Sequence, residues 1–349
     1  MTETMRAAVL HGREDVRMEE VPAPRPGPGE VRVRVRAALT CGTDTKVFRR
    51  GYHARMIQPP ALFGHEMAGV VESVGAGVTS FAPGTPVVTA NSAPCGACDF
   101  CRAGRDSLCD DLLFWNGAYA ELALIPARIV AKNLVALPPG LSFRRAAMTE
   151  PLACVVRGVE GSAIEPGHTV AVIGSGPIGL MFVRLAVAAG ARVLVAGRRQ
   201  RRLDKALELG ADKVVSAEDG DIAELLRRET PQGRGADVVV EAAGRAETSE
   251  AALRVVRKGG TVQLFAGTPA GTTLPLDLAH VHYEEITVTS RFHHTPRSFR
   301  EALRLIAEGI VDPDALISGE RELDALPAVL AEMARGSDDL KTAIVPPAP

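Results

Sequence analysis

The sequence predicts an α/β protein in two parts, a strand-rich first part and a second part built as a doubly wound parallel sheet. Between residues 31 and 37, Val and Ala alternate with Arg, which is the period of a half-buried strand. From about residue 165, apolar strands alternate with segments of helical length, which favours parallel strands joined by right-handed crossovers. A chain of 349 residues is long enough for two domains.

The individual elements follow from local patterns. Further short strands are predicted at 69–74 and 86–89 in the first part, where Gly and Pro interrupt them. In the second part, strands are predicted at 169–173, 192–196, 213–216, 236–241, 261–265 and 286–290, and helices at 177–189, 199–209, 221–230 and 247–257. Helix 177–189 is apolar nearly all round, so we expect it to be buried. Thr295 and Pro296 open a later helix as its cap and its first residue.

Charge and hydropathy exclude two classes of partner. The formal net charge is -2, which gives no bulk attraction to nucleic acid or to an anionic membrane. The N-terminus has no apolar run of signal-peptide length, and no stretch of 18 apolar residues occurs. We therefore expect a cytoplasmic protein that binds neither nucleic acid nor membrane, in which clustered cysteines are metal ligands rather than disulfides.

A glycine-rich turn follows the first strand of the second part. Gly174, Gly176 and Gly179 form the pattern G-x-G-x-x-G, after the strand TVAVI and at the start of the apolar helix. In this context the three glycines allow a tight turn, close approach of a pyrophosphate and close packing of helix on strand. The free N–H groups of the helix start attract the phosphates. The pattern predicts a dinucleotide site at the turn, which also includes Pro177 and Ile178.

The residues after the next strand indicate which dinucleotide binds. A carboxylate there would bind the ribose 2′-OH of NAD, but the strand is followed by Gly197, Arg198 and Arg199. Guanidinium groups match the geometry of a 2′-phosphate, so NADP is favoured over NAD. The alternative is that these arginines form a solvated helix face. We also expect Ala243 and Gly267 to contact the cofactor.

Four of the six cysteines fall within fifteen residues, namely Cys95, Cys98, Cys101 and Cys109. Four thiolates this close together can enclose a tetrahedral ion, and a closed site of four cysteines is structural zinc. An iron–sulfur cluster fits less well, because the last gap is seven residues and no proline follows. A nucleic-acid zinc finger would have two separated cysteine pairs in basic surroundings.

Four further residues have side chains that bind metals, at separated positions in the first part. They are Cys41, His65, Glu66 and Glu150. Each alone is weak evidence, since a single buried Cys or His is usually structural. Together they offer a sulfur, an imidazole and two carboxylates, and three such ligands with an open position make a catalytic zinc site.

With these motifs the sequence resembles the zinc-dependent medium-chain dehydrogenases, in particular their polyol (sorbitol) and threonine dehydrogenase branch. The resemblance rests on G-H-E-x-x-G at Gly64–Gly69, on the Cys95–Cys109 segment and on the turn at Gly174–Gly179. It implies a GroES-like catalytic domain at 1–152, with a structural zinc lobe at 91–112, completed by 291–349. It also implies a Rossmann domain at 153–290.

The resemblance further implies a chemistry and a set of residues. Cys41 and His65 would bind a catalytic zinc, which Glu66 and Glu150 complete or approach, directly or through water. Thr43 would be the first proton-relay group, while Lys46 stands where relatives often have a relay histidine. Cys154 is expected to be a packed core thiol. The expected reaction is hydride transfer from a secondary alcohol to the nicotinamide, with two zinc ions per chain.

The substrate is the least determined of these predictions. The candidate lining residues are Lys46, Phe48, Phe114, Trp115, Phe292, His293 and His294. Their polar members favour a polyol, cyclitol or sugar-type alcohol, although the aromatics equally suit ordinary core packing. The alternatives are threonine, butanediol or simple alcohols as substrates, and a non-catalytic NADP-binding zinc protein. The resemblance also implies a homodimer or homotetramer, for which strand 286–290 is a candidate pairing edge.

Overall fold

The computed structural model describes residues 3–347, which form two compact units. Unit 1 contains residues 3–153 and 294–347, and unit 2 contains residues 154–293. The sequence places the boundaries after residues 152 and 290, and the units of the structure divide after Ala153 and His293. Among the described residues, no helix is both long enough and apolar enough to span a membrane.

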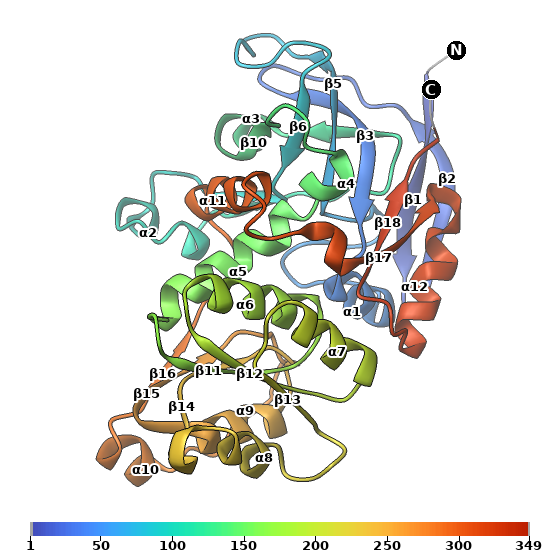
Figure 1. Ribbon diagram of the computed structural model, residues 1–349. Helices are drawn as coiled ribbons and strands as arrows, with labels where there is room; N and C mark the ends of the chain where they lie inside the picture. The colour runs from blue at the N-terminus through green and yellow to red at the C-terminus, as the bar shows by residue number, and fades with distance from the viewer. Residues whose placement is uncertain (1–2, 348–349) are drawn as a thin grey trace. The chain divides into compact units, whose positions relative to one another are not determined.

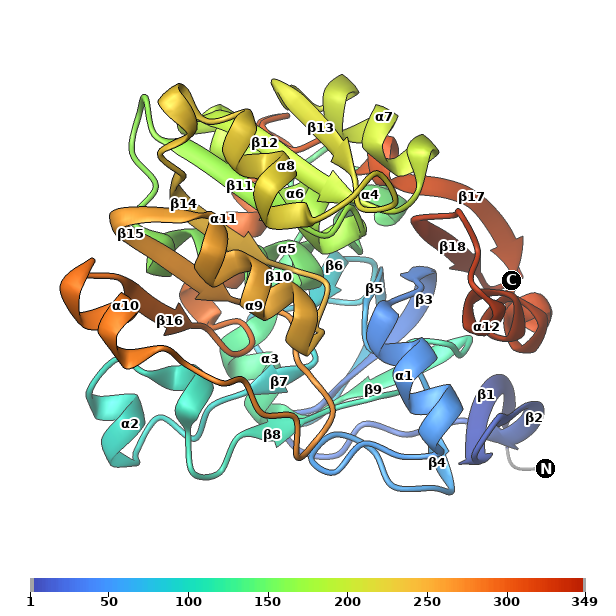
Figure 2. The same ribbon diagram turned by 90° about the horizontal axis from the view of Figure 1, so that it is seen from below.

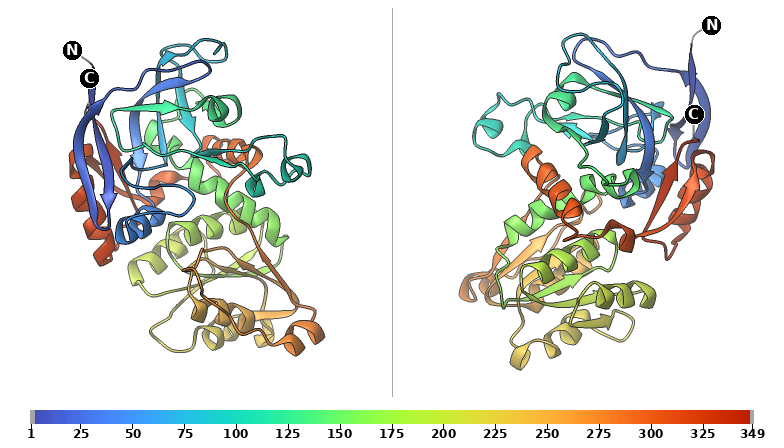
Figure 3. Two further views of the ribbon diagram at one scale, coloured as in Figure 1. Left: turned by 180° about the vertical axis from the view of Figure 1, so that it is seen from behind. Right: turned by 45° about the horizontal axis from the view of Figure 1, so that its top comes forward.

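Unit 1 is built around a sheet to which both ends of the chain contribute. Within residues 3–347 this sheet has seven strands. Their order is β10 (Leu134–Ala136), β6 (Pro86–Thr89), β5 (Met67–Val74), β3 (Val31–Leu39), β18 (Lys341–Val345) and β17 (Ile317–Glu322), and β9 (Leu122–Ile125) also pairs with β3. The late strand β18 lies antiparallel to the early strand β3, with Ala343 opposite Leu39 (Figures 1 and 3). This pairing brings the start of β18 to the place where β3 ends.

Smaller elements surround this sheet. The remaining strands are β1 (Thr4–Gly12), β2 (Asp15–Pro22) and β4 (Ala61–Leu62) in one sheet, and β7 (Ser92–Ala93) and β8 (Leu113–Phe114) in another. The helices are α1 (Gly42–Arg50), α2 (Asp99–Arg102), α3 (Ala127–Asn133), α4 (Phe143–Ala146), α11 (Pro296–Ala307) and α12 (Leu326–Arg335). Short 3₁₀ turns are η1 (Asp106–Leu108), η3 (Pro313–Leu316) and η4 (Leu323–Ala325). The predicted cap of α11 is confirmed, because the Thr295 side chain accepts a hydrogen bond from the Ser298 N–H.

Unit 2 is the predicted doubly wound parallel sheet (Figures 1 and 2). Its strand order is β13 (Lys213–Ser216), β12 (Arg192–Gly197), β11 (Thr169–Ile173), β14 (Ala236–Glu241), β15 (Val256–Leu264) and β16 (Thr287–Ser290), and every neighbouring pair is parallel. The order reverses between β11 and β14, and in such sheets ligands bind at the carboxyl ends of the strands at this point.

Helices cover both faces of this sheet. The chain enters unit 2 along α5 (Thr149–Ser162). Figure 1 shows α6 (Pro177–Ala188) and α7 (Gln200–Glu208) on one face, and α8 (Ile222–Arg228) and α9 (Ala246–Val255) on the other. The 3₁₀ turn η2 (Pro231–Gly233) and helix α10 (Leu278–Tyr283) complete the unit. Helix α6 is buried as predicted, and its Phe182 meets Phe265 edge to face at 4.8 Å between ring centroids.

One strand differs clearly from its prediction. β15 begins at Val256, five residues before the predicted start, and directly follows α9. Its first residue pairs with Ala236, the register then shifts, and regular pairing resumes between Thr261 and Val238. Gly259 has a φ of +67° within this irregular stretch, where a glycine favours a bulge over a straight strand. Gly259 and the following Gly260 therefore lie at a bulge inside the strand.

Candidate active site

The first candidate ligand, Cys41, caps helix α1 where strand β3 ends. Its Sγ accepts a hydrogen bond from the Thr43 N–H at 3.4 Å, and its own N–H donates to Asp44 Oδ2 at 2.9 Å. This reciprocal arrangement is a capping box, which satisfies free N–H groups at the helix start. The helix start thereby fixes the Cys41 side chain.

Three atoms that can bind a metal come together where β3 ends and α1 begins. One atom each of Cys41, His65 and Glu66 lie within 4.8 Å of one another, and the His65 and Glu66 side chains are buried. Asp44 Oδ1 lies 3.1 Å from His65 Nδ1, which leaves Nε2 for a metal. A carboxylate on the second ring nitrogen is typical of zinc-binding histidines. A thiolate, an imidazole and a carboxylate are zinc's ligand types, so these residues fit a zinc ion.

The charge around Cys41 favours its metal-binding form. Burial alone raises the pKa of the Cys41 thiol, but the hydrogen bond with His65 and the positive charge of Lys341 bring it down to about 7. The thiolate is the form of cysteine that binds metals. The protein environment therefore favours a ligating sulfur at this position.

Glu66 has a partner that the sequence did not indicate. Lys341 Nζ, at the start of β18, lies 2.8 and 2.6 Å from the two carboxylate oxygens of Glu66. The same ammonium group donates to the Thr40 carbonyl at 2.8 Å. All of these groups are buried in unit 1, so Glu66 is a buried carboxylate held by a buried lysine beside Cys41 and His65.

Glu150 lies in the first turn of α5 and is not one of these three donors. Its side chain is buried, and burial together with the negative charge of Glu66 raises the pKa of Glu150 to about 7, while His65 opposes the rise. His294 Nε2 lies 3.6 Å from Glu150 Oε1 and 2.9 Å from Asn91 Oδ1. The structure thus places the predicted substrate residue His294 against Asn91 and Glu150, inside unit 1.

The four-cysteine segment forms a compact sulfur cluster. The sulfurs of Cys95, Cys98, Cys101 and Cys109 lie within 4.8 Å of one another, and none of these cysteines is in a disulfide. Backbone N–H groups donate to sulfur, for example from Ala97 to Cys95 at 3.3 Å and from Gly96 to Cys101 at 3.4 Å. Donors from Ala97 and Cys98 lower the pKa of Cys95 to about 6. The geometry fits a tetrahedral ion with four thiolate ligands.

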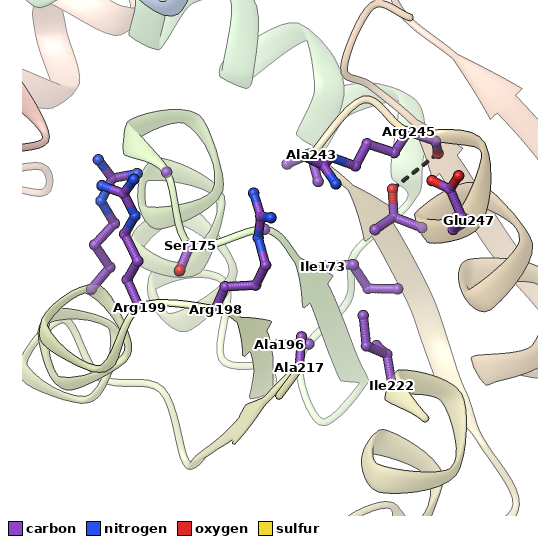
Figure 4. A pocket seen from close by; sticks show the side chains of 16 residues that line it. Ile173, Ser175, Ala196, Arg198, Arg199, Ala217, Ile222, Ala243, Arg245 and Glu247 are labelled. Atoms are coloured by element: carbon purple, nitrogen blue, oxygen red, sulfur yellow. Dashed lines mark hydrogen bonds between the residues drawn. The ribbon is translucent and has the colours of Figure 1, made fainter. Parts of the chain in front are cut away.

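The glycine-rich turn lines a pocket of about 460 Å³ in unit 2 (Figure 4). Gly174, with a φ of +117°, forms the turn, Gly176 caps α6, and Pro177 is the first helical residue. A Cβ on Gly179 would overlap the Gly174 carbonyl, so only glycine allows the helix this close to the turn. The predicted residues on the pocket wall are Gly174, Gly176, Gly197, Arg198, Arg199 and Ala243.

The remaining predicted cofactor residues lie in the first turn of α6 and in the loop after β15. Pro177, Ile178 and Gly179 belong to the first turn of α6 behind the pocket wall. Gly267 follows β15, and its carbonyl lies close to Gly244 after β14. Both loops are therefore at the carboxyl ends of strands that neighbour the crevice.

Four arginines lie on the wall of this pocket. Arg198, Arg199 and Arg202 come from the end of β12 and the start of α7, and Figure 4 shows Arg245 across the pocket from Arg198. Gly197 ends β12, and a Cβ there would overlap Ser175 Oγ and lie 2.8 Å from Ser175 Cβ. The end of β12 thus carries no carboxylate, because its last residue is Gly197, and Ser175 fills the space that a side chain at position 197 would need.

The predicted substrate residues are scattered over both units. In unit 1, Lys46 is exposed on α1, Phe48 is in the core and Phe114 is half-buried in β8. Trp115 is 8% exposed, donates to the Leu124 carbonyl at 2.7 Å and lines a second pocket with residues of β1, β2 and β4.

The two other substrate candidates belong to unit 2. Phe292 is exposed, and its ring stacks on the His293 ring with 5.5 Å between centroids. Cys154, expected to be a packed core thiol, is half-buried in α5.

Sequence reasoning missed several residues of the site. Asp44 had a signal, because an acidic residue three positions after a helix-capping residue is the pattern of a capping box. No such signal marked Lys341, Asn91 or Tyr119, whose hydroxyl donates to Asp44 Oδ2 at 2.6 Å, because each depends on a contact between distant segments. Arg202 and Arg245 lie in or near the recognised motifs but were not assigned to the pocket wall.

Comparisons with known proteins match both parts of the chain. Residues 27–138 match the alcohol dehydrogenase GroES-like domain, and residues 177–308 match the zinc-binding dehydrogenase family. Sorbitol dehydrogenase of Bacillus subtilis is 30% identical over 92% of this chain and 91% of its own. D-xylulose reductase A of Neosartorya fischeri is 31% identical over 87% of this chain and 86% of its own.

Solved structures agree with these matches. A zinc-binding dehydrogenase from Sinorhizobium meliloti bound to NADP has a TM-score of 0.91 and 33% identity, over 99% of this chain and 100% of its own. An alcohol dehydrogenase from Thermus sp. ATN1 has a TM-score of 0.89 and 33% identity, over 98% of this chain and 100% of its own. The predicted GroES-like and Rossmann architecture is confirmed, and the chain belongs to the zinc-dependent alcohol dehydrogenase family.

Proposed function

We propose that this enzyme oxidises a secondary alcohol of the polyol class to a ketone, with NADP as the preferred hydride acceptor and two zinc ions per chain. The observation that carries the proposal is the set of Cys41, His65 and Glu66, whose donor atoms lie within 4.8 Å of one another. A non-catalytic protein has no use for such a mixed site with an open position. The four-cysteine cluster is the proposed site of the second, structural ion.

In this proposal the residues of unit 1 bind the metal and transfer the proton of the substrate hydroxyl. A zinc ion held by Cys41, His65 and Glu66 would supply a Lewis acid that lowers the pKa of an oxygen ligand. Asp44 holds His65 through Nδ1, so that Nε2 is presented as a ligand. The Thr43 hydroxyl, two residues after Cys41, takes the proton of the substrate hydroxyl and passes it toward solvent. A nicotinamide cofactor held at the turn Gly174–Gly179 would supply the two-electron hydride acceptor that the oxidation requires.

The residues of unit 2 hold the cofactor. The N-terminus of α6 and the turn at Gly174–Gly176 offer N–H groups to the pyrophosphate. Arg198, Arg199 and Arg202 line the pocket beyond Gly197, where a 2′-phosphate needs positive charge. The relative from Sinorhizobium meliloti was solved with NADP, which supports the preference.

The substrate class rests on the relatives. The matched curated proteins include sorbitol dehydrogenases and D-xylulose reductases, which act on sugar alcohols or the related ketose. A panel of polyols, cyclitols, threonine, 2,3-butanediol and primary alcohols, assayed with both cofactors, tests the class. We expect the highest kcat/KM with a polyol or cyclitol. A higher kcat/KM with threonine or a primary alcohol contradicts this assignment.

Removal of the proposed zinc thiolate tests the reaction itself. In Cys41→Ser we expect kcat to fall by about 10³-fold, because several kcal/mol of transition-state stabilisation depend on the metal. Zinc content should fall from two ions per chain to one, while NADPH binding measured by fluorescence should stay normal. Full turnover in Cys41→Ser, or two retained zinc ions, contradicts the proposal.

Substitution of the arginines tests the cofactor preference. We expect Arg198→Ala and Arg199→Ala each to lower kcat/KM with NADP by about 10-fold and to leave the value with NAD nearly unchanged, because a charged hydrogen bond contributes about 1.5–3 kcal/mol. Arg201→Ala is the matched control, since Arg201 is exposed on α7 and is not on the pocket wall. Equal efficiency with both cofactors in the parent enzyme would disprove the preference.

A reversal of preference needs two substitutions. An aspartate at position 197 would face the ribose 2′-OH, but its Cβ would overlap Ser175. We therefore expect Gly197→Asp paired with Ser175→Gly to favour NAD, and Gly197→Asp alone to bind either cofactor poorly. Measured kcat/KM values for the single and double variants decide between these outcomes.

A further inference from the structure

We propose that Tyr119 is a positioning residue for the zinc held by Cys41 and His65, and that its hydroxyl acts through Asp44. This inference rests on the proposed function. Tyr119 is 1% exposed, and its hydroxyl lies 2.6 Å from Asp44 Oδ2 and 3.0 Å from the Leu39 carbonyl. These hydroxyl contacts do not include the metal-binding atoms of Cys41, His65 or Glu66, and Tyr119 is not on the wall of the cofactor pocket.

Asp44 is the residue whose carboxylate Tyr119 would hold in place. Its Oδ1 lies 3.1 Å from His65 Nδ1, and its Oδ2 accepts the Cys41 N–H at 2.9 Å. One buried carboxylate therefore orients two of the three proposed ligands. The Tyr119 hydroxyl is its third partner, and it bonds the same oxygen that holds the Cys41 backbone. Outer partners of this kind fix the orientation and basicity of zinc-binding histidines.

The ring of Tyr119 separately supports the backbone of the ligand loop. Gly64, directly before His65, has a φ of +91°, and a Cβ there would overlap the Tyr119 ring. The Tyr119 N–H donates to the Phe63 carbonyl at 3.0 Å, so the two segments are also joined through the backbone. The ring and the hydroxyl thus have different partners. A phenylalanine would keep the ring contact with Gly64 and remove only the bond to Asp44.

The burial of Asp44 makes this bond matter. The Asp44 side chain is 1% exposed, so water does not readily replace a lost donor. Without the hydroxyl, Oδ2 keeps the Cys41 N–H alone, and the carboxylate gains freedom to turn away from His65. The expected effect is therefore a weaker and less rigid zinc site, in addition to any loss of overall stability.

The test is Tyr119→Phe in the zinc-loaded enzyme, with Tyr52→Phe as matched control. Tyr52 is 51% exposed on unit 1 and has no part in the site. Zinc loss to a chelator is followed by metal analysis, and kcat, KM and thermal unfolding are measured on the same samples. We expect Tyr119→Phe to speed the loss of one zinc ion by about 10-fold, which is the lower end of the range for residues that hold a metal ligand. The same variant should lower kcat more than it changes KM. The other ion, proposed for Cys95–Cys109, should leave at the parent rate.

A double variant separates positioning from packing. If the hydroxyl acts through Asp44, Tyr119→Phe should add little to the effect of Asp44→Asn on zinc loss and on kcat. Additive effects, or zinc loss and kcat within about twofold of the parent, would overturn the inference, whatever happens to the unfolding temperature. The proposed function fails in a different way, namely if the parent enzyme and Cys41→Ser hold the same amount of zinc.

Discussion

Lys341 and Glu66 show at the scale of single residues how far the site depends on distant contacts. They are 275 positions apart in the sequence, yet Lys341 Nζ contacts both carboxylate oxygens of Glu66. Burial opposes the charge on the lysine, but Glu66 and Cys41 raise the pKa of Lys341 above its ordinary value. The ion pair beside the proposed zinc ligands is therefore a property of the fold, which pairs β18 with β3.

Removal of one partner of this pair should be costly. In Lys341→Met we expect the free energy of unfolding to fall by about 3–5 kcal/mol, because an uncompensated carboxylate remains buried. Denaturant unfolding of the enzyme without the zinc ion proposed for Cys41, His65 and Glu66 measures the loss, because that ion would itself compensate the Glu66 charge. The double variant Lys341→Met with Glu66→Gln carries no buried charge at this pair and should recover most of the stability. A typical point mutation changes the free energy of unfolding by about 1 kcal/mol. If Lys341→Met lowers it by no more than this, the lysine is not needed to compensate Glu66.

The residues that sequence reasoning identified are those whose function needs a local pattern. Cys41, His65, Gly174 and the four cysteines each stand in a short motif whose spacing is set by the chemistry. Asp44 was within reach of the same reasoning, because it completes the capping box that begins at Cys41. Lys341, Tyr119 and Asn91 were not, since no local pattern distinguishes a buried lysine, tyrosine or asparagine from an exposed one.

At the scale of elements, the second half of the chain was more predictable than the first. Strands buried on both faces, such as Thr169–Ile173 and Ala236–Glu241, are continuous apolar runs with clear limits. Unit 1 is harder to predict because its strands are short and its sheet joins segments from both ends of the chain. The pairing of β18 with β3 follows from no periodicity, and neither do the bounds of two-residue strands such as β4 and β7.

Glycines explain where the element predictions succeeded and where they failed. At Gly179 the prediction of close helix–strand contact agrees with the structure, because a Cβ there would overlap the Gly174 carbonyl. Gly259 and Gly260 fall between the predicted helix 247–257 and the predicted strand 261–265, but in the structure they lie at a bulge within β15. The difference is that the first glycine belongs to a motif with one known geometry, whereas an isolated pair suits several.

At the scale of the whole molecule, unit 2 carries an edge suited to self-association. β16 is the last strand of its sheet, so one side of its backbone has no strand partner within the described part of the chain. Exposed apolar side chains gather on the same segment, with Leu278 72% exposed, Tyr283 81% exposed and Val288 39% exposed. We propose that two copies of the chain pair through β16 and α10, which would give the expected homodimer or the dimer within a homotetramer.

A charge placed on this edge should separate the copies. In Val288→Lys we expect the mass in solution, measured by light scattering or sedimentation, to fall to that of a smaller assembly, because a lysine on an edge strand blocks pairing with another chain. Leu207→Lys is the matched control, since Leu207 on α7 is 43% exposed, close to the 39% of Val288, and α7 contacts the strands at the other end of the sheet. If Val288→Lys leaves the mass unchanged, or if Leu207→Lys lowers it as much, the copies associate through another surface. Because the cofactor pocket lies at the crevice between β11 and β14, the separated Val288→Lys protein should still bind NADPH, which distinguishes a lost interface from a lost fold.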